Sequence, residues 1–191
     1  MRGWLLFLAL SLHLTPVQAH ESATVCFNYG CLVRVAVLFP EDILEEAAVS
    51  LRMADTPVEE RGILAQVMGR WYRWAGLHTP IAVDRPGDFL DDGVHGMMDC
   101  IDHAETTTGF LEILAKRGLL RFHEVDRIHR RVRWLFAQHF SAVIREKQSN
   151  ITGEGSPLPR FVVDTWFGEH GDPAVVLPLE DWMDGEGPNV S

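Results

Sequence analysis

The sequence predicts an α+β protein, because helical patterns come first along the chain and strand-like patterns come later. Three helical patterns lie within residues 41–117, and segments rich in β-branched and aromatic residues follow at 127–136, 139–146 and 160–167. This order is typical of folds in which helices pack on one antiparallel sheet. The chain has 191 residues, of which 47% are hydrophobic, enough for a single domain that we assign to residues 20–191.

The first two helices are indicated by their N-terminal signals. The first is expected to begin near Pro40, where acidic residues follow at the positive end of the helix dipole: Glu41, Asp42, Glu45 and Glu46. The second has Asp55 or Thr56 as its N-cap and Pro57 at its first position. Apolar residues then recur at helical spacing up to Gly76, where we expect this helix to end.

The third helix is predicted from about Cys100 to Arg117, after a loop that covers residues 79–98. This loop holds two prolines, three glycines and four aspartates, and loops of such length often carry function. Asp99 has the position of an N-cap, and Asp102 follows three residues later at the capping-box position. Cys100 is therefore expected in the first helical turn.

Residues 1–19 have the pattern of a cleaved secretory signal peptide. Arg2 precedes an apolar run from Trp4 to Leu14, and the segment ends in the small residue Ala19. The run is about half of the ~20 apolar residues that a membrane span requires. We therefore expect cleavage near Ala19, export to a periplasmic or secreted location, and no stable membrane insertion afterwards.

The charge of the chain limits the partners that it can attract. The formal net charge is −10, with 17 basic and 27 acidic residues. An acidic exported protein is a poor partner for nucleic acid and for anionic membrane surfaces. The sequence does not define an oligomeric state.

Two of the three cysteines are close in sequence. Thiols tend to pair in the oxidising compartments that exported proteins reach. Cys26 and Cys31 flank a short segment in which Asn28 and Gly30 favour turn conformations. We expect a disulfide between Cys26 and Cys31, with two unpaired buried thiols as the alternative. The disulfide leaves Cys100 as a single thiol, which is either buried and inert or free for a functional reason.

Cys100 needs a cationic partner to become a reactive thiolate. The helix N-terminus lowers the pKa of a thiol, whereas the carboxylates of Asp99 and Asp102 raise it. His139 begins one predicted strand, and Asp164 lies in the next, where a buried carboxylate requires a partner. Adjacent strands would let Asp164 orient the imidazole and leave its other nitrogen for the thiol, as in acyl-transfer catalysis. This pairing predicts fast alkylation of Cys100 near pH 6.

These motifs resemble those of bacterial transglutaminase-like cysteine proteinases, in the transglutaminase-like branch of the papain-like superfamily. The family signature reads roughly Gly-Asp-Cys-Glu-Asp-Tyr-Ala, and residues 98–104 match it at four positions: Asp99, Cys100, Asp102 and Ala104. The resemblance covers about residues 60–170. It implies a papain-like or transglutaminase-like fold, in which N-terminal helices and a central nucleophile helix pack on an antiparallel sheet.

The resemblance also implies a function. Cys100 is expected as the nucleophile, His139 as general base and acid, and Asp164 as the orienting carboxylate of a protease. Such an enzyme cleaves peptide or isopeptide bonds in a protein or peptide substrate, and transglutaminase-type transfer to an amine is the alternative. Some relatives bind calcium through acids beside the cysteine, which makes Asp99 and Asp102 candidate ligands. Ile101 replaces the glutamate of the signature, and no other cofactor is expected.

Two further interpretations compete for the same residues. His95, Cys100, Asp102 and His103 are close enough in sequence for a metal site, but they lack the spacings typical of zinc. The fold could also serve as a binding module without catalysis. We expect His103 on a helix face, and His123 and His129 at solvated positions of a basic strand.

Overall fold

The computed structural model describes residues 20–87, 93–133, 137–148 and 157–188. This part of the chain is an α+β structure with four α-helices and two antiparallel sheets, which confirms the predicted class. No helix in the described ranges is long and apolar enough to cross a membrane. The expected signal peptide, residues 1–19, lies outside the described residues.

A two-stranded sheet opens the described chain. Strand β1 (His20–Phe27) pairs with β2 (Val33–Pro40) in antiparallel register, from His20↔Pro40 to Phe27↔Val33. This hairpin was not predicted from the sequence. Its inward-facing side chains belong to the main core: Ala23, Val25, Phe27, Val37 and Phe39.

Helices α1 (Glu41–Arg52) and α2 (Pro57–Gly76) follow and begin where the sequence predicts. The Thr56 hydroxyl accepts a hydrogen bond from the main-chain N–H of Glu59 at 3.2 Å, which decides between the two expected caps. The Glu59 side chain accepts from the Thr56 N–H at 3.1 Å and completes a capping box. A short 3-10 helix, η1 (Pro80–Val83), comes next.

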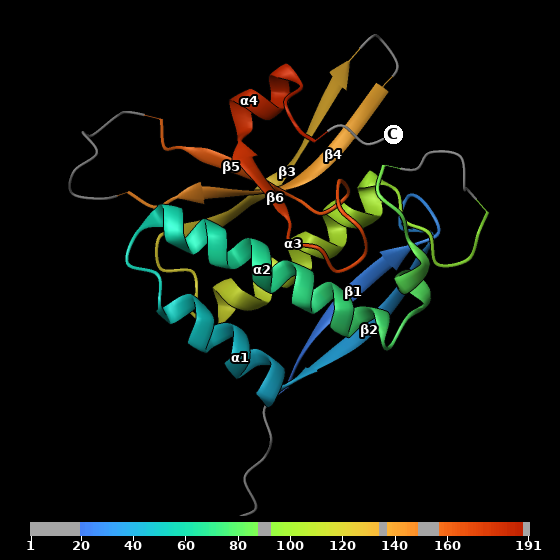
Figure 1. The fold of residues 1–191 in the computed structure, drawn as a ribbon, viewed down its shortest axis with the longest axis horizontal. Coiled ribbons are helices and arrows are strands. Elements are labelled where there is room, and N and C mark those ends of the chain that lie inside the picture. Colours follow the sequence, from blue (N-terminus) through green and yellow to red (C-terminus); the bar gives the residue numbers. More distant parts are fainter. Residues whose placement is uncertain (1–19, 88–92, 134–136, 149–156, 189–191) are drawn as a thin grey trace, which may run out of the picture.

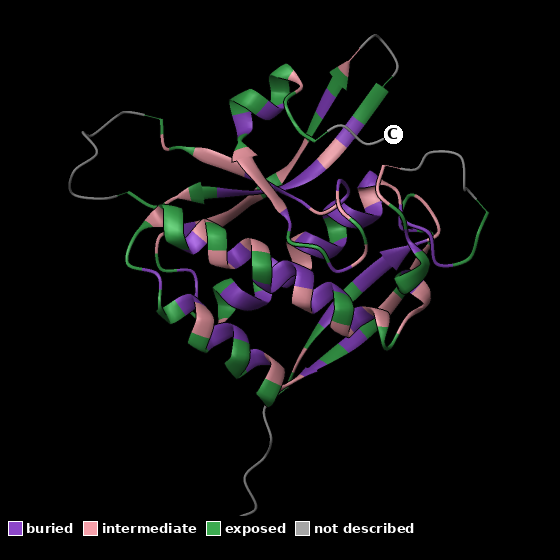
Figure 2. Cartoon of the chain, viewed as in Figure 1, coloured by how far each residue is buried: buried purple, intermediate pink, exposed green. Residues whose placement is uncertain are grey.

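Helix α3 (Cys100–Lys116) lies at the centre of the molecule, between the two sheets (Figure 1). It contacts β1 on one side and β3 and β4 on the other. Phe110 and Leu111 are fully buried, and most of this helix is coloured as buried in Figure 2. Because its middle is fixed from both sides, its first turn has a defined place in the fold.

The second sheet has the strand order β3-β4-β5-β6. Its strands are β3 (His123–Arg133), β4 (Ala137–Glu146), β5 (Arg160–Asp164) and β6 (Val175–Pro178). The first three correspond to the predicted strands, although β3 begins four residues earlier and the predicted residues 134–136 lie outside the described ones. The fourth strand, β6, was not predicted.

The two faces of this sheet meet different parts of the protein. Ala142, Ile144 and Val163 join the main core that contains α3. Val143 and Val162 face the other way and pack in a second apolar cluster with Trp182 of the short helix α4 (Leu179–Asp184). This alternation follows the two-residue period of a strand, and it places α4 against the face opposite to the main core (Figure 1).

Candidate active site

His139 and Asp164 meet through the pairing of β4 with β5. These strands are antiparallel, with Ala142 opposite Val163, so Asp164 lies diagonally across from His139 on the same face. The Nε2 atom of His139 is 2.7 Å from Oδ2 of Asp164, and both side chains are buried. The expected contact between the two residues is therefore present.

Asp164 is held by two further donors. The indole N–H of Trp182 donates to Oδ2 at 3.0 Å, and the main-chain N–H of Trp166 donates to Oδ1 at 3.2 Å. The second contact is a turn of the Asx type, which explains why β5 ends at Asp164 and not at Phe167 as predicted. Both carboxylate oxygens thus have partners, which offsets the cost of their burial.

Aromatic rings surround the imidazole of His139. The ring centroids of Trp166, Phe167 and Trp182 lie 4.7, 5.3 and 5.5 Å from its own. Arg131 donates to the main-chain carbonyl of Trp182 at 2.5 Å and so ties α4 to β3. These rings exclude water from the His139–Asp164 hydrogen bond, and aromatic faces are favourable neighbours for an imidazolium.

The second imidazole nitrogen, Nδ1 of His139, is buried and has no hydrogen-bond partner among the described residues. Because a carboxylate only accepts, Nε2 carries the proton in the hydrogen bond to Asp164. In the neutral imidazole, Nδ1 then has a lone pair and no donor within the described part of the chain. Cys100 does not hydrogen-bond to it in this structure.

Cys100 begins α3 and is 8% exposed. It belongs to the same apolar cluster as Trp166, the residue that lies against the His139 ring. Burial raises the pKa of this thiol to about 11, and the charges of Asp99 and Asp164 act in the same direction. The main-chain N–H groups of Phe140 and of Cys100 itself oppose this increase in pKa without reversing it. The Cys100 thiol is thus protonated at neutral pH, contrary to the sequence-based expectation of a thiolate near pH 6.

We expect alkylation of Cys100 by iodoacetamide to be slow near pH 6 and to accelerate continuously as the pH approaches about 11. The reason is that only the thiolate reacts, and its fraction rises tenfold per pH unit below the pKa. The rate is measured by mass spectrometry of the Cys100 peptide. A rate that is already maximal below pH 7 would instead indicate a preformed thiolate–imidazolium pair.

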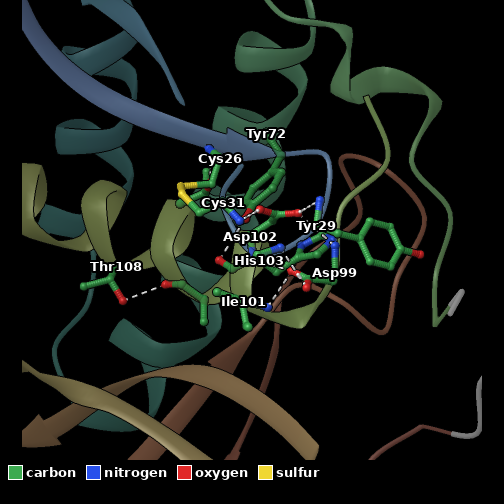
Figure 3. The surroundings of a disulfide bond; sticks show 12 residues. Cys26, Tyr29, Cys31, Tyr72, Asp99, Ile101, Asp102, His103 and Thr108 are labelled. Atoms are coloured by element: carbon green, nitrogen blue, oxygen red, sulfur yellow. Dashed lines mark hydrogen bonds between the residues drawn. A yellow bond between two sulfur atoms is a disulfide. The ribbon is translucent and has the colours of Figure 1, made fainter. Parts of the chain in front are cut away.

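The predicted disulfide between Cys26 and Cys31 is confirmed, with a Cα–Cα distance of 4.6 Å. The loop that it closes makes a left-handed turn, since residues 28–31 have φ values of 67°, 65°, 63° and 57°. Only Gly30 adopts this conformation at no steric cost. The turn aims consecutive main-chain N–H groups at the start of α3 (Figure 3).

The two acids beside Cys100 accept those N–H groups. Asp102 accepts from Cys31 at 2.6 Å and from Tyr29 at 2.8 Å, and Asp99 accepts from Gly30 at 2.9 Å. Asp99 also caps α3, because its Oδ1 accepts from the N–H groups of Ile101 and Asp102. The disulfide loop and the first turn of α3 therefore hold each other in place.

These contacts do not fit the expected calcium site. The oxygens of Asp99 and Asp102 already accept main-chain N–H groups, and such an oxygen has little capacity left for a cation. Burial raises the pKa of Asp102 to about 6, which the N–H group of Asp99 counteracts. In the part of the chain that the structure describes, no group of three His, Cys, Asp or Glu side chains could hold a metal ion. The alternative of a metal site therefore finds no support there.

Two buried histidine–carboxylate pairs were missed by the sequence analysis. His103 bonds through Nε2 to Asp84 at 2.9 Å and through Nδ1 to the Thr165 hydroxyl at 2.9 Å. His123 bonds through Nδ1 to Glu60 at 2.8 Å. His103 lies on a buried face of α3, the expectation that His123 is solvated is wrong, and His129 is half-buried. The first pair joins the loop before α3 to the residue that follows Asp164, so it fixes the surroundings of the site.

A pocket of about 620 Å³ opens beside the thiol. Its lining comes from the disulfide loop, the start of α3 and the start of β4: Tyr29, Asp99, Cys100, Ile101, Ala137, Gln138 and Phe140. His139 is not among these residues. The volume falls within the ~300–1,000 Å³ that is typical of ligand-binding pockets.

Comparison with known proteins identifies no relative. No family model matches the chain, and neither the curated proteins nor the solved structures include a match. The geometry of Cys100, His139 and Asp164 therefore carries the functional inference by itself.

Proposed function

We propose that this protein is an exported thiol acyl-transfer enzyme of papain-like or transglutaminase-like fold. Cys100 is the nucleophile, His139 the general base and acid, and Asp164 the carboxylate that orients His139. The leading reaction is hydrolysis of a peptide or isopeptide bond in a protein or peptide substrate. No cofactor takes part in these steps.

One observation carries the proposal. His139 is bound through Nε2 to Asp164 at 2.7 Å, while its Nδ1 is buried with no partner among the described residues. Most buried polar side-chain atoms have a hydrogen-bond partner, as both nitrogens of His103 do. A nitrogen without a partner, next to the apolar cluster that holds the Cys100 thiol, supports the role of a base that awaits its proton.

The reaction consists of two half-reactions. In the first, Nδ1 of His139 takes the thiol proton while Sγ of Cys100 attacks the substrate carbonyl carbon. The C–N bond breaks, the departing amine takes the proton from Nδ1, and a thioester remains on Cys100. In the second, Nδ1 takes a proton from water as the water oxygen attacks the thioester. The C–S bond then breaks, the product leaves as a carboxylic acid, and Nδ1 returns the proton to the thiolate.

The main-chain N–H of Cys100 is suited to stabilise the oxyanion that forms in each half-reaction. This N–H lies in the first turn of α3, where helix geometry provides no acceptor for it. A hydrogen bond from this N–H to Sγ lowers the pKa of the Cys100 thiol. The same position lets it donate to a carbonyl oxygen that is bound to Sγ.

The proposal is tested by exposing a mixture of exported proteins to the wild type and to Cys100→Ala. We expect new N-termini that depend on Cys100, detected by mass spectrometry of labelled amino termini. New amine cross-links in place of N-termini would assign the alternative, transglutaminase-type transfer. The absence of either product, with both proteins folded, would contradict an acyl-transfer function.

A second candidate is a binding module with this fold but without catalysis. The observation that favours it is the buried thiol, whose pKa is raised to about 11 and which makes no hydrogen bond to His139. Catalysis then requires that substrate binding brings Sγ to Nδ1. Product formation separates the two candidates. A binding module yields no product even as the wild type, and its Cys100→Ala variant still binds the partner.

A further inference from the structure

We infer that the pocket beside Cys100 binds an apolar, uncharged side chain on the acyl side of the substrate. This inference rests on the proposed function and goes beyond it, because it names the class of substrate. Three observations support it: the apolar lining of the pocket, the hydrogen bonds that already engage Asp99 there, and the absence of His139 from the lining.

The lining is mainly apolar. Ile101 is half-buried in the first turn of α3, and Phe140 is half-buried in β4. The exposed methyl group of Ala137 and the ring of Tyr29 complete the apolar walls. At about 620 Å³ the pocket has room for a large aliphatic or aromatic side chain together with part of the peptide backbone.

The only ionisable carboxylate in the lining is that of Asp99, and it is already engaged. Its Oδ1 accepts the N–H groups of Ile101 and Asp102, and its Oδ2 accepts the N–H of Gly30. These donors and the positive end of the helix dipole balance its charge. A cationic substrate group therefore gains little here, and a substrate carboxylate finds no cationic side chain in the lining to pair with.

The position of His139 assigns the pocket to the acyl group. Gln138 and Phe140 line the pocket, whereas His139 between them does not and lies against the Trp166 ring. The leaving amine must approach His139, because it takes its proton from Nδ1. A substrate group in the pocket therefore belongs to the acyl portion of the substrate. This is the portion that remains bound to Cys100 after the amine leaves.

The first test varies the acyl group while the leaving group stays constant. p-Nitrophenyl acetate, hexanoate and hemisuccinate are compared by the rate at which they acylate Cys100, relative to their rates with free cysteine. We expect hexanoate to be favoured over acetate by about tenfold or more, since methylenes in an apolar pocket give such ratios. Hemisuccinate should be disfavoured. A hexanoate-to-acetate ratio equal to that of free cysteine would overturn the inference.

A matched pair of variants locates the effect. Ala137→Glu places a carboxylate in the pocket at an exposed position, and we expect it to reduce the hexanoate-to-acetate ratio to near that of free cysteine. Ala115→Glu makes the same change at an exposed position near the other end of α3, and should retain the wild-type ratio. Equal ratios in the two variants would show that the preference arises elsewhere.

A binding measurement separates this inference from the proposed function. N-acetyl-leucinamide and N-acetyl-aspartamide are titrated into Cys100→Ala, and NMR shifts are followed at Ile101 and Ala137. Selective binding of the leucine compound supports the pocket even if the wild type is never acylated, in which case only the proposed function fails. If the wild type is acylated but Cys100→Ala binds the two compounds equally, the inferred preference of the pocket is wrong and the proposed function stands. No binding and no acylation would overturn both.

Discussion

Replacing Asp164 with asparagine should lower the turnover of p-nitrophenyl acetate by roughly 10²- to 10⁴-fold, the range for loss of general acid–base catalysis. An asparagine side chain has one accepting oxygen and one donating NH2 group. Both oxygens of Asp164 accept, from His139, Trp182 and the Trp166 N–H. If the amide nitrogen faces His139, it favours the tautomer with the proton on Nδ1, which cannot act as a base. If it faces the Trp166 N–H, two donors oppose each other.

The control for this change is Asp181→Asn. Asp181 is an exposed residue of α4, the helix that supplies Trp182, and its side chain makes no described hydrogen bond. We expect it to retain wild-type turnover, and circular dichroism should show that both variants are folded. A folded Asp164→Asn protein with undiminished turnover would remove Asp164 from the site.

Replacing Glu60 with alanine should reduce the free energy of unfolding by about 3 kcal/mol or more, because each buried donor left without a partner costs about 1–3 kcal/mol. Glu60 is fully buried and accepts the main-chain N–H groups of Arg121, Phe122 and His123 at 2.7–3.1 Å. It also accepts from the His123 ring at 2.8 Å. Without the carboxylate these donors are left buried at the connection between α3 and β3, which is costly.

The loss is measured by urea unfolding of Glu60→Ala beside Glu112→Ala. Glu112 is exposed on α3 and makes no described contact, so its replacement should change stability by less than about 0.5 kcal/mol. Equal stability of the two variants would contradict the structural role assigned to Glu60.

The Glu60 contacts also predict how stability depends on pH. Burial raises the pKa of Glu60, but hydrogen bonds from the His123 side chain and from the N–H groups of Phe122 and Arg121 outweigh it and lower the pKa below its usual 4.5. A lowered pKa stabilises the fold above the unfolded value, and this contribution is lost as the pH falls below about 4.5. Glu60→Ala should therefore lose less stability than the wild type on acidification.

The parts of the fold that the sequence predicted are those with local signals. Thr56, Pro57 and Glu59 lie within one turn of each other, and Asp99 and Asp102 are likewise close, so their capping is readable from spacing alone. The disulfide was predicted for the same reason, as Cys26 and Cys31 are five positions apart. Strand β6 is only four residues long, too short to show a period.

The parts that were missed depend on partners that are distant in sequence. Glu60 and His123 are 63 positions apart, and Asp84 and His103 are 19 apart, so only the packed fold shows that they pair. The pairing of His139 with Asp164, 25 positions apart, was predicted because two apolar strands made a buried carboxylate conspicuous. The sequence left open whether Cys100 is buried and inert or free, and in the fold its burial raises the pKa of the thiol against the opposing effect of the main-chain N–H groups.

The most direct test of the account is the fate of the acyl group from p-nitrophenyl acetate in the wild type and in His139→Ala. We expect the wild type to release p-nitrophenolate in a burst and then steadily, with one acetyl group per chain found on Cys100 by peptide mass spectrometry. His139→Ala should show no steady turnover, because neither the thiol nor the water that attacks the thioester then has a base. An acetyl group on residues other than Cys100, or undiminished steady turnover in His139→Ala, would contradict the account.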